Sequence, residues 1–234
     1  TNSITISGDL VVASNQVFTG SKSFTINGGG VTGDGVISLS GGTFTLNGTG
    51  NFGGTSNWTF NNLTFGSGSS GVSTAQSSGD VTVSGTFIVT TSQTLNGSKD
   101  FTINNGSVTS NGTITLTGGT FLLDGTGNFG GTSDWTFYNL TFGDGSGAAT
   151  TTGTSTGTTT ISNVLTIASN QILNASSKTW TLSGPGTPFV VNGTFNYQTS
   201  TFRYTANADT YITATDYYNL ELRPENNAPD APDT

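Results

Sequence analysis

The chain has 234 residues and a formal net charge of −8, with 8% charged and 31% hydrophobic residues and no cysteine, methionine or histidine. This acidic balance argues against binding to nucleic acid or to an anionic membrane, because both attract lysine and arginine. The missing cysteine and histidine exclude thiolate chemistry, zinc clusters and the commonest general base, so we expect no cofactor, no metal and no enzymatic activity.

Local preferences favour strands and turns over helices. Threonine, serine, glycine and asparagine dominate the composition, whereas strong helix formers are scarce. The 15 phenylalanines and the regular apolar alternation supply the burial that disordered chains lack. No apolar run is long enough to cross a bilayer, so we expect no membrane insertion.

A repeat of 77 residues organises the chain. Residues 41–70 recur as 118–147 with six differences, and ITISG at Ile4 corresponds to VTVSG at Val81. A third copy opens at Thr159. We therefore expect one continuous solenoid over residues 1–223, with copies 4–80, 81–158 and 159–223, followed by an acidic, proline-rich tail or linker at 224–234.

Shorter units lie inside each copy. Triplets with apolar outer residues follow one another at intervals of 18 to 22 residues, and their period of two points the outer residues inward and the middle residue to water. The predicted fold is all-β, a parallel β-helix (β-solenoid) of about twelve coils of about 19 residues, forming a rod roughly 55 to 60 Å long. The twelve triplets start at Ile4, Phe24, Phe44, Leu63, Val81, Phe101, Phe121, Leu140, Thr159, Trp180, Phe202 and Leu220.

A string of three tandem β-sandwich modules is the alternative architecture. Against it, no proline-rich or charged linker separates the copies, and the triplets keep their spacing across the copy boundaries. The solenoid is favoured, and the sandwich remains the second hypothesis.

Two residue types recur at fixed positions of the repeat. The three lysines, Lys22, Lys99 and Lys178, are interpreted as surface residues copied by duplication, the alternative being isopeptide partners or cations for an acidic ligand. Trp58 and Trp135 lie in alternating strands, where an aromatic side chain is more often buried than free to stack on a sugar.

The third copy departs from the pattern after Trp180. A terminal repeat of a solenoid must protect an open end, and tyrosine and arginine are also enriched at protein contacts. We therefore predict a cap or a partner-contact surface, or both, formed by Arg203, Tyr204, Tyr211, Tyr217, Tyr218 and Arg223.

Two acidic features are candidates for sites of chemistry. Asp209, Asp216 and Glu221 are the densest carboxylates, but nothing in the sequence fixes the spacing that a glycosidase needs. The GDGSG turn at Asp144 resembles no known calcium repeat loop, and its counterpart in the first copy has Ser67 in place of the aspartate.

Glycosylation is a further hypothesis, which applies only where the source organism modifies asparagine. Nine Asn-x-Ser/Thr sequons begin at Asn47, Asn57, Asn62, Asn96, Asn105, Asn111, Asn139, Asn174 and Asn192.

Several phrases of the sequence, including GTFTLNGTG, NWTFNNLTF, DWTFYNLTF and YYNLEL, resemble the β-strand repeats of secreted bacterial surface proteins. Adhesins built like filamentous haemagglutinin belong to that group. The resemblance covers most of the chain through Leu222 and implies a parallel β-helix that forms stalks, adhesive fibres or cell-surface filaments. It carries over no catalytic residue.

From these features we expect a structural rod located outside the cell or on its surface, as a subunit or segment of a filament or adhesin. The expected partners are further copies of the chain, associating head to tail, and polysaccharide. The alternative function is a carbohydrate-binding or ice-binding module that uses outward threonines.

Overall fold

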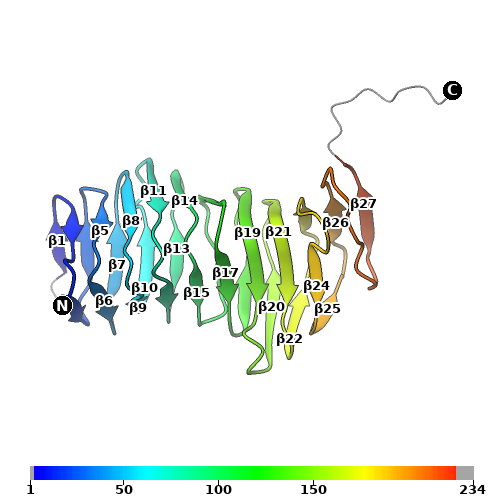
Figure 1. Ribbon diagram of the computed structural model, residues 1–234, viewed down its shortest axis with the longest axis horizontal. Helices are drawn as coiled ribbons and strands as arrows, with labels where there is room; N and C mark the ends of the chain where they lie inside the picture. Colours follow the sequence, from blue (N-terminus) through cyan, green and yellow to red (C-terminus); the bar gives the residue numbers. More distant parts are fainter. Residues whose placement is uncertain (1–2, 225–234) are drawn as a thin grey trace.

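The structure is a computed structural model that describes residues 3–224. It is a β-solenoid built from 27 strands, and every strand pair in it is parallel (Figure 1). No helix forms among the described residues, and none could therefore cross a membrane. The predicted fold is confirmed, and the sandwich alternative, which needs antiparallel strands, is wrong. Of the predicted tail, residues 225–234 lie outside the described part of the chain.

Each turn of the solenoid passes through three faces in a fixed order. The first face consists of two stacks of strands, which meet where Val108 pairs with Phe129 and the Ser110 Oγ accepts a hydrogen bond from the Val89 N–H at 2.9 Å. Its strands are β1 (Ile4–Ile6), β4 (Phe24–Ile26), β7 (Thr43–Leu46), β10 (Asn62–Phe65), β13 (Phe87–Val89), β18 (Gly127–Phe129), β20 (Ala149–Gly153), β22 (Gln171–Asn174) and β25 (Thr194–Asn196).

The second face runs without a break from one end of the rod to the other. Its strands are β2 (Leu10–Val11), β5 (Val31–Thr32), β8 (Gly50–Gly53), β11 (Gly71–Ala75), β14 (Gln93–Gly97), β16 (Thr113–Leu116), the first part of β19 (Trp135–Phe142), the first part of β21 (Thr159–Ile167), β23 (Thr179–Leu182), β26 (Thr201–Tyr204) and β27 (Asn219–Leu222).

The third face is continuous with the second through two long strands. A register irregularity between Phe137 and Asn139 lets β19 turn from one face to the other without a loop. The strands of this face are β3 (Val17–Gly20), β6 (Val36–Leu39), β9 (Trp58–Phe60), β12 (Val81–Val83), β15 (Phe101–Ile103), β17 (Thr120–Leu123), the second parts of β19 and β21, and β24 (Phe189–Val191).

The solenoid has about ten turns of about 21 residues, so the expected twelve coils of about 19 need correction. Paired residues lie from 18 apart, between Thr201 and Asn219, to 25 apart, between Asn139 and Val164. The triplet spacing predicted too short a turn at the copy boundaries. Leu63 pairs with Phe87 and not with Val81, where the next triplet begins. At about 4.8 Å per turn, ten turns form a rod about 45 to 50 Å long.

Each copy of the 77-residue repeat begins on a different face. The 77-residue repeat is about seven residues shorter than four turns of about 21 residues, and seven residues are one third of a turn. The triplets of the first copy therefore stack on the first face, those of the second copy on the third face, and those of the third copy on the second face. A duplicated side chain thus points to a different side of the rod in each copy.

The core is a column of apolar side chains enclosed by the three faces. In β4, Phe24 and Ile26 are buried, whereas Thr25 between them is half-buried on the outer side, as the alternation predicted. Trp58 and Trp135 are 0% and 1% exposed, which confirms the prediction that both belong to the core. Aromatic rings pack within coils and between them; for example, the ring centroids of Phe24 and Phe44 and of Trp180 and Phe202, in successive coils, are 6.4 and 6.1 Å apart.

The corners between faces bring coils so close that some positions accept glycine alone. A Cβ atom on Gly131 would stand 1.8 Å from the Ser110 carbonyl oxygen of the coil below. Gly54, the equivalent residue of the first copy, has the same 1.8 Å relation to the Gly33 oxygen. Stacking at the normal inter-strand distance therefore depends on these missing side chains.

We expect Gly131→Ala to lower the free energy of unfolding by about 3 kcal/mol, because the added methyl group forces two coils apart. Gly147→Ala is the matched control, since nothing lies within 4 Å of a Cβ there, and it should change stability by less than about 0.5 kcal/mol. Urea unfolding followed by tryptophan fluorescence measures both. Equal midpoints for the two variants would contradict the close approach.

Candidate functional site

The charged residues of the predicted terminal set form an ion-pair network on the second face. Arg203 on β26 and Glu221 on β27 are paired in register, and the Arg203 Nε donates to the Glu221 Oε2 at 2.7 Å. The Arg223 Nε lies 3.1 Å from the same oxygen. The Arg203 hydrogen bond, more than any other cause, lowers the pKa of the Glu221 carboxyl. These outward side chains fasten the last strand to the one below it.

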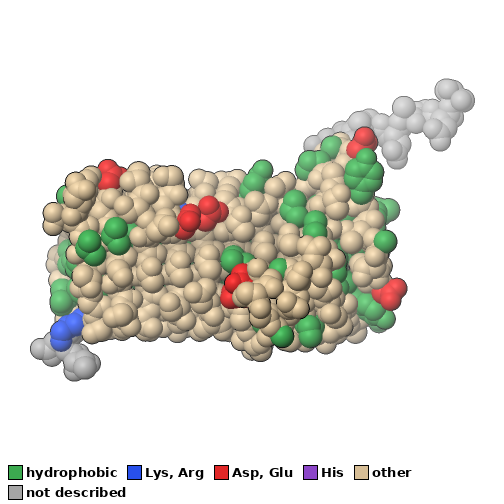
Figure 2. Space-filling view, turned by 60° about the horizontal axis from the view of Figure 1, so that its bottom comes forward, with side chains coloured by type: hydrophobic (Ala, Val, Ile, Leu, Met, Phe, Trp, Pro, Cys, Tyr) green, Lys and Arg blue, Asp and Glu red, His purple; other side chains and the backbone are tan. Residues whose placement is uncertain are grey.

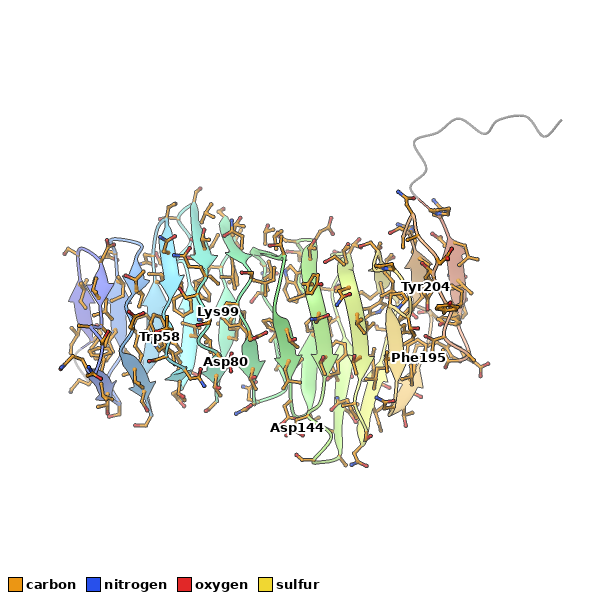
Figure 3. All side chains as sticks on the ribbon, viewed as in Figure 1. Trp58, Asp80, Lys99, Asp144, Phe195 and Tyr204 are labelled. Atoms are coloured by element: carbon orange, nitrogen blue, oxygen red, sulfur yellow. The ribbon has the colours of Figure 1, made fainter. Side chains whose placement is uncertain are left out.

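Two tyrosines of the set close the core at the same end. The Tyr204 and Tyr217 hydroxyls are 3.0 Å apart, and the Tyr217 hydroxyl donates to the Thr213 carbonyl at 3.0 Å. The Tyr217 ring packs on Phe195 and Phe202, with centroids 6.1 and 5.7 Å away. Burial, followed by the hydrogen bond with Tyr204, raises the pKa of the Tyr217 phenol. Figure 3 shows Tyr204 and Phe195 within the last coils.

The structure therefore divides the predicted terminal set into two groups. Arg203, Tyr204 and Tyr217 are buried or half-buried, and their polar atoms bond within the chain, as a cap would require. Tyr211 and Tyr218, in contrast, are 69% and 58% exposed, and the Arg223 side chain is 66% exposed. The second group is the part of the set that a partner could reach.

A groove of about 350 Å³ opens beside this cap. It lies at the corner between the second and third faces, where Gly186 below it pairs with Thr210. Its walls are mostly apolar, with the Asp209 carboxylate among them; the lining residues are Tyr204, Ala206, Ala208, Asp209, Thr210, Ile212, Leu222 and Pro224.

The acidic residues weighed for chemistry do not converge. Glu221 is occupied by two arginines, Asp209 lines the groove, and Asp216 is exposed on the segment before β27. Asp144 is held in its own turn, where the Ser146 hydroxyl and backbone N–H both donate to Oδ1 and lower the pKa of the carboxyl. Among residues 3–224, no cluster of three or more acidic side chains could hold a metal ion.

The predicted surface position of the lysines is wrong for two of the three. Lys99 is 1% exposed, and its ammonium group lies inside a corner of the solenoid (Figure 3). Its Nζ donates to the Gln76 carbonyl one coil below at 3.3 Å and to the Gly54 carbonyl two coils below at 3.4 Å. The same Nζ lies 5.9 Å from the Trp58 ring centroid. Burial lowers the pKa of Lys99, while the charges of nearby aspartates oppose the shift.

Lys178 repeats this arrangement at a different corner. It is 4% exposed, and its Nζ donates to the Gly157 carbonyl of the coil below. Burial lowers the pKa of Lys178 from 10.5 to about 8, against the opposing charge of Asp134. Lys22 is exposed, as predicted. Sequence alone does not distinguish Lys22 from the other two lysines, because all three occupy the same position of the repeat.

Two buried glutamines escaped the sequence analysis. Gln93 and Gln171 are each 1% exposed, and their Nε2 atoms donate to the Ser73 Oγ at 3.1 Å and the Thr151 Oγ1 at 3.0 Å. Both follow a tight turn in which a residue with positive φ, Ser92 or Asn170, precedes the glutamine. The signal was present in the aligned copies, as TSQ and SNQ before an apolar strand.

The sequon asparagines take different positions. The Asn47 Nδ2 donates to the Asn27 Oδ1 at 2.9 Å, and two further asparagine pairs join neighbouring coils in the same way. Nδ2, the atom that would carry a glycan, is a donor in Asn47, Asn62 and Asn174. Asn96 and Asn139 are half-buried, and the exposed sequon residues are Asn57, Asn105, Asn111 and Asn192.

Comparisons with known proteins give no relative: no family model matches the chain, and neither do the curated proteins or the solved structures searched.

The lowered pKa of Lys178 predicts that stability depends on pH. Between pH 8 and 10.5 the unfolded chain binds more protons than the folded one, so the free energy of unfolding rises with pH across this interval. We expect Lys178→Met to remove part of that rise, on the order of 1 to 2 kcal/mol between pH 8 and 10. Urea unfolding at the two pH values measures it. Lys22→Met, at an exposed position, should keep the full rise, and equal slopes in the two variants would contradict the assignment.

Proposed function

We propose that the chain is a structural rod, a rigid segment of an extracellular or cell-surface filament or adhesin. The observation that carries this proposal is the unbroken register of the third face. One row of outward side chains passes through every strand from Thr19 to Val190 in eight steps, each between directly paired residues. A stack of this kind resists bending, because bending must lengthen backbone hydrogen bonds on one side of it.

Other features support a mechanical role outside the cell. Among the described residues, the buried side chains form a continuous apolar column along the axis of the rod. The chain contains no cysteine or methionine, and it therefore offers oxidants little to attack. The resemblance of its strand phrases to secreted surface proteins points the same way. We propose no enzymatic role.

A distance measurement tests the rigidity. The Thr19→Cys, Val190→Cys double variant carries two spin labels at the ends of the outward row, eight steps of about 4.8 Å apart, so the distances should centre near 38 Å in a narrow distribution. The native chain has no cysteine that would add background labelling. Pulsed electron resonance reads the distribution, and a broad one would contradict a rigid rod.

A second candidate function is supported by the threonines of the second face. Thr115, Thr136, Thr160 and Thr181 form one outward row in register. Thr113 and Thr179 stand two residues before members of this row, so strands β16 and β23 each present a pair of hydroxyl groups on one side. A regular hydroxyl array of this kind suits an ordered polysaccharide surface or ice.

Paired variants test this candidate. We expect Thr136→Lys with Thr160→Lys to reduce binding to insoluble polysaccharide, or thermal hysteresis, by roughly tenfold or more, since two long cations then interrupt the array. The control is Thr82→Lys with Thr102→Lys, at paired outward positions on the third face, which should leave either activity unchanged. No binding and no hysteresis in the unmodified chain would dismiss the candidate.

A further inference from the structure

The first coil contains two side chains whose counterparts are buried elsewhere in the rod. Gln16 corresponds to Gln93 and Gln171, and Lys22 corresponds to Lys99 and Lys178. The later residues are 1% to 4% exposed, whereas Gln16 and Lys22 are exposed. The sequence thus places at this end side chains that are covered in every later copy.

The buried counterparts of Gln16 and Lys22 contact coils that precede them in the chain. Lys99 bonds to carbonyls 23 and 45 residues before it, and Gln93 bonds to Ser73 and to the Gly48 carbonyl, 20 and 45 residues before it. Both side chains therefore reach one and two coils toward the N-terminus. The surface that suits Gln16 and Lys22 is accordingly the C-terminal end of another β-solenoid of this kind.

Within residues 3–224, both ends of the rod keep an unpaired strand edge on the second face, β2 at one end and β27 at the other, and exposed apolar side chains. At the N-terminal end, Val11 beside β5 and Val17 on β3 are 66% and 61% exposed, and Ile4 is 44% exposed. At the C-terminal end, Leu220 and Leu222 on β27 are 42% and 61% exposed. Hydrophobic side chains gather toward the two ends, while the visible flank is mostly polar (Figure 2). Edge strands of this kind are templates for pairing with another chain.

The two ends also match corner by corner. A groove of about 320 Å³ at the N-terminal end is lined by Leu10, Val11, Val12, Ala13, Gln16, Val17 and Phe18, at the corner between the second and third faces. The C-terminal groove lies at the same corner. The two ends also carry opposite charges: exposed Lys22 lies in the segment between β3 and β4 at the N-terminal end, and exposed Asp216 lies in the segment between β26 and β27 at the C-terminal end.

We propose that two copies of the chain associate end to end, with the N-terminal end of the second copy on the C-terminal end of the first. This inference rests on the proposed structural role. The strand edge of β27 pairs in parallel with β2 of the next copy, the two grooves face each other, and Lys22 meets Asp216. Strand direction is preserved because all pairs in the solenoid are parallel. The contact is heterologous, so it extends into an open chain of rods.

The unmodified chain tests this directly, by sedimentation velocity and negative-stain electron microscopy over a range of concentrations. We expect linear strings of rods whose length grows with concentration. Val17→Glu should raise the concentration needed for association by roughly tenfold or more, because it places a charge in the contact. Tyr138→Glu, at a 38% exposed aromatic on the flank, is the matched control and should associate like the unmodified chain.

The charge pair gives a second, reciprocal test. Lys22→Asp and Asp216→Lys should each weaken association, and the double variant that exchanges the two charges should restore it. Both positions are exposed, so neither change should alter the thermal unfolding of the monomer.

The outcomes separate this inference from the proposed function. Single rods at every concentration, lateral bundles, strings unaffected by Val17→Glu, or no recovery in the exchanged variant would each overturn the end-to-end contact and leave the rigid rod standing. A broad spin-label distribution in the monomer would overturn the rod itself. Two results together would establish the contact. Val17→Glu should shorten the strings, and the association lost in Lys22→Asp and in Asp216→Lys should return in the double variant that exchanges the two charges.

Discussion

Parallel hydrogen bonding between successive coils is the interaction on which the rest of this structure depends. Each strand is too short to be stable alone, since most have two to five residues, and it gains its partners from the turns before and after it. Register is fixed because a slip by one residue would exchange buried phenylalanines for threonines. Stability is therefore distributed along the axis, and the strands described at each end of the rod lack a partner on one side.

The same constraint explains the buried polar groups. At a corner the backbone changes direction, and some of its carbonyl oxygens then point into the rod. The Lys99 ammonium donates to such oxygens one and two coils below it, and the Gln93 amide donates to one two coils below it. Leaving such acceptors unpaired would cost about 1 to 3 kcal/mol each, so a buried lysine with a lowered pKa is tolerated where it satisfies them. In this solenoid the lysines therefore serve the packing of the corners.

The sequence predicted the strand content, the inward side of each strand and the burial of Trp58 and Trp135, because these follow from a period of two that is local. It did not predict the number of turns, because the 77-residue period is not a whole number of turns of about 21 residues and the sequence displays only the 77-residue period. The exposure of Lys22 against the burial of Lys99 was equally inaccessible, since it depends on how many coils precede the residue. Among the terminal residues, composition marked the set as a cap or a contact surface but could not show that Tyr217 packs on Phe195 while Tyr218 beside it stays exposed.

The rotation of each copy by one face couples the length of such a rod to the direction of its tip. One 77-residue copy adds about 3.7 turns, or about 18 Å, and turns whatever follows it by about 120° around the axis. Three copies return a feature to its original azimuth. Duplication or loss of one copy would therefore change both the axial position and the azimuth of a group attached to the end of the rod. Only a gain or loss of three copies, or a multiple of three, would change the length of the rod and keep that azimuth.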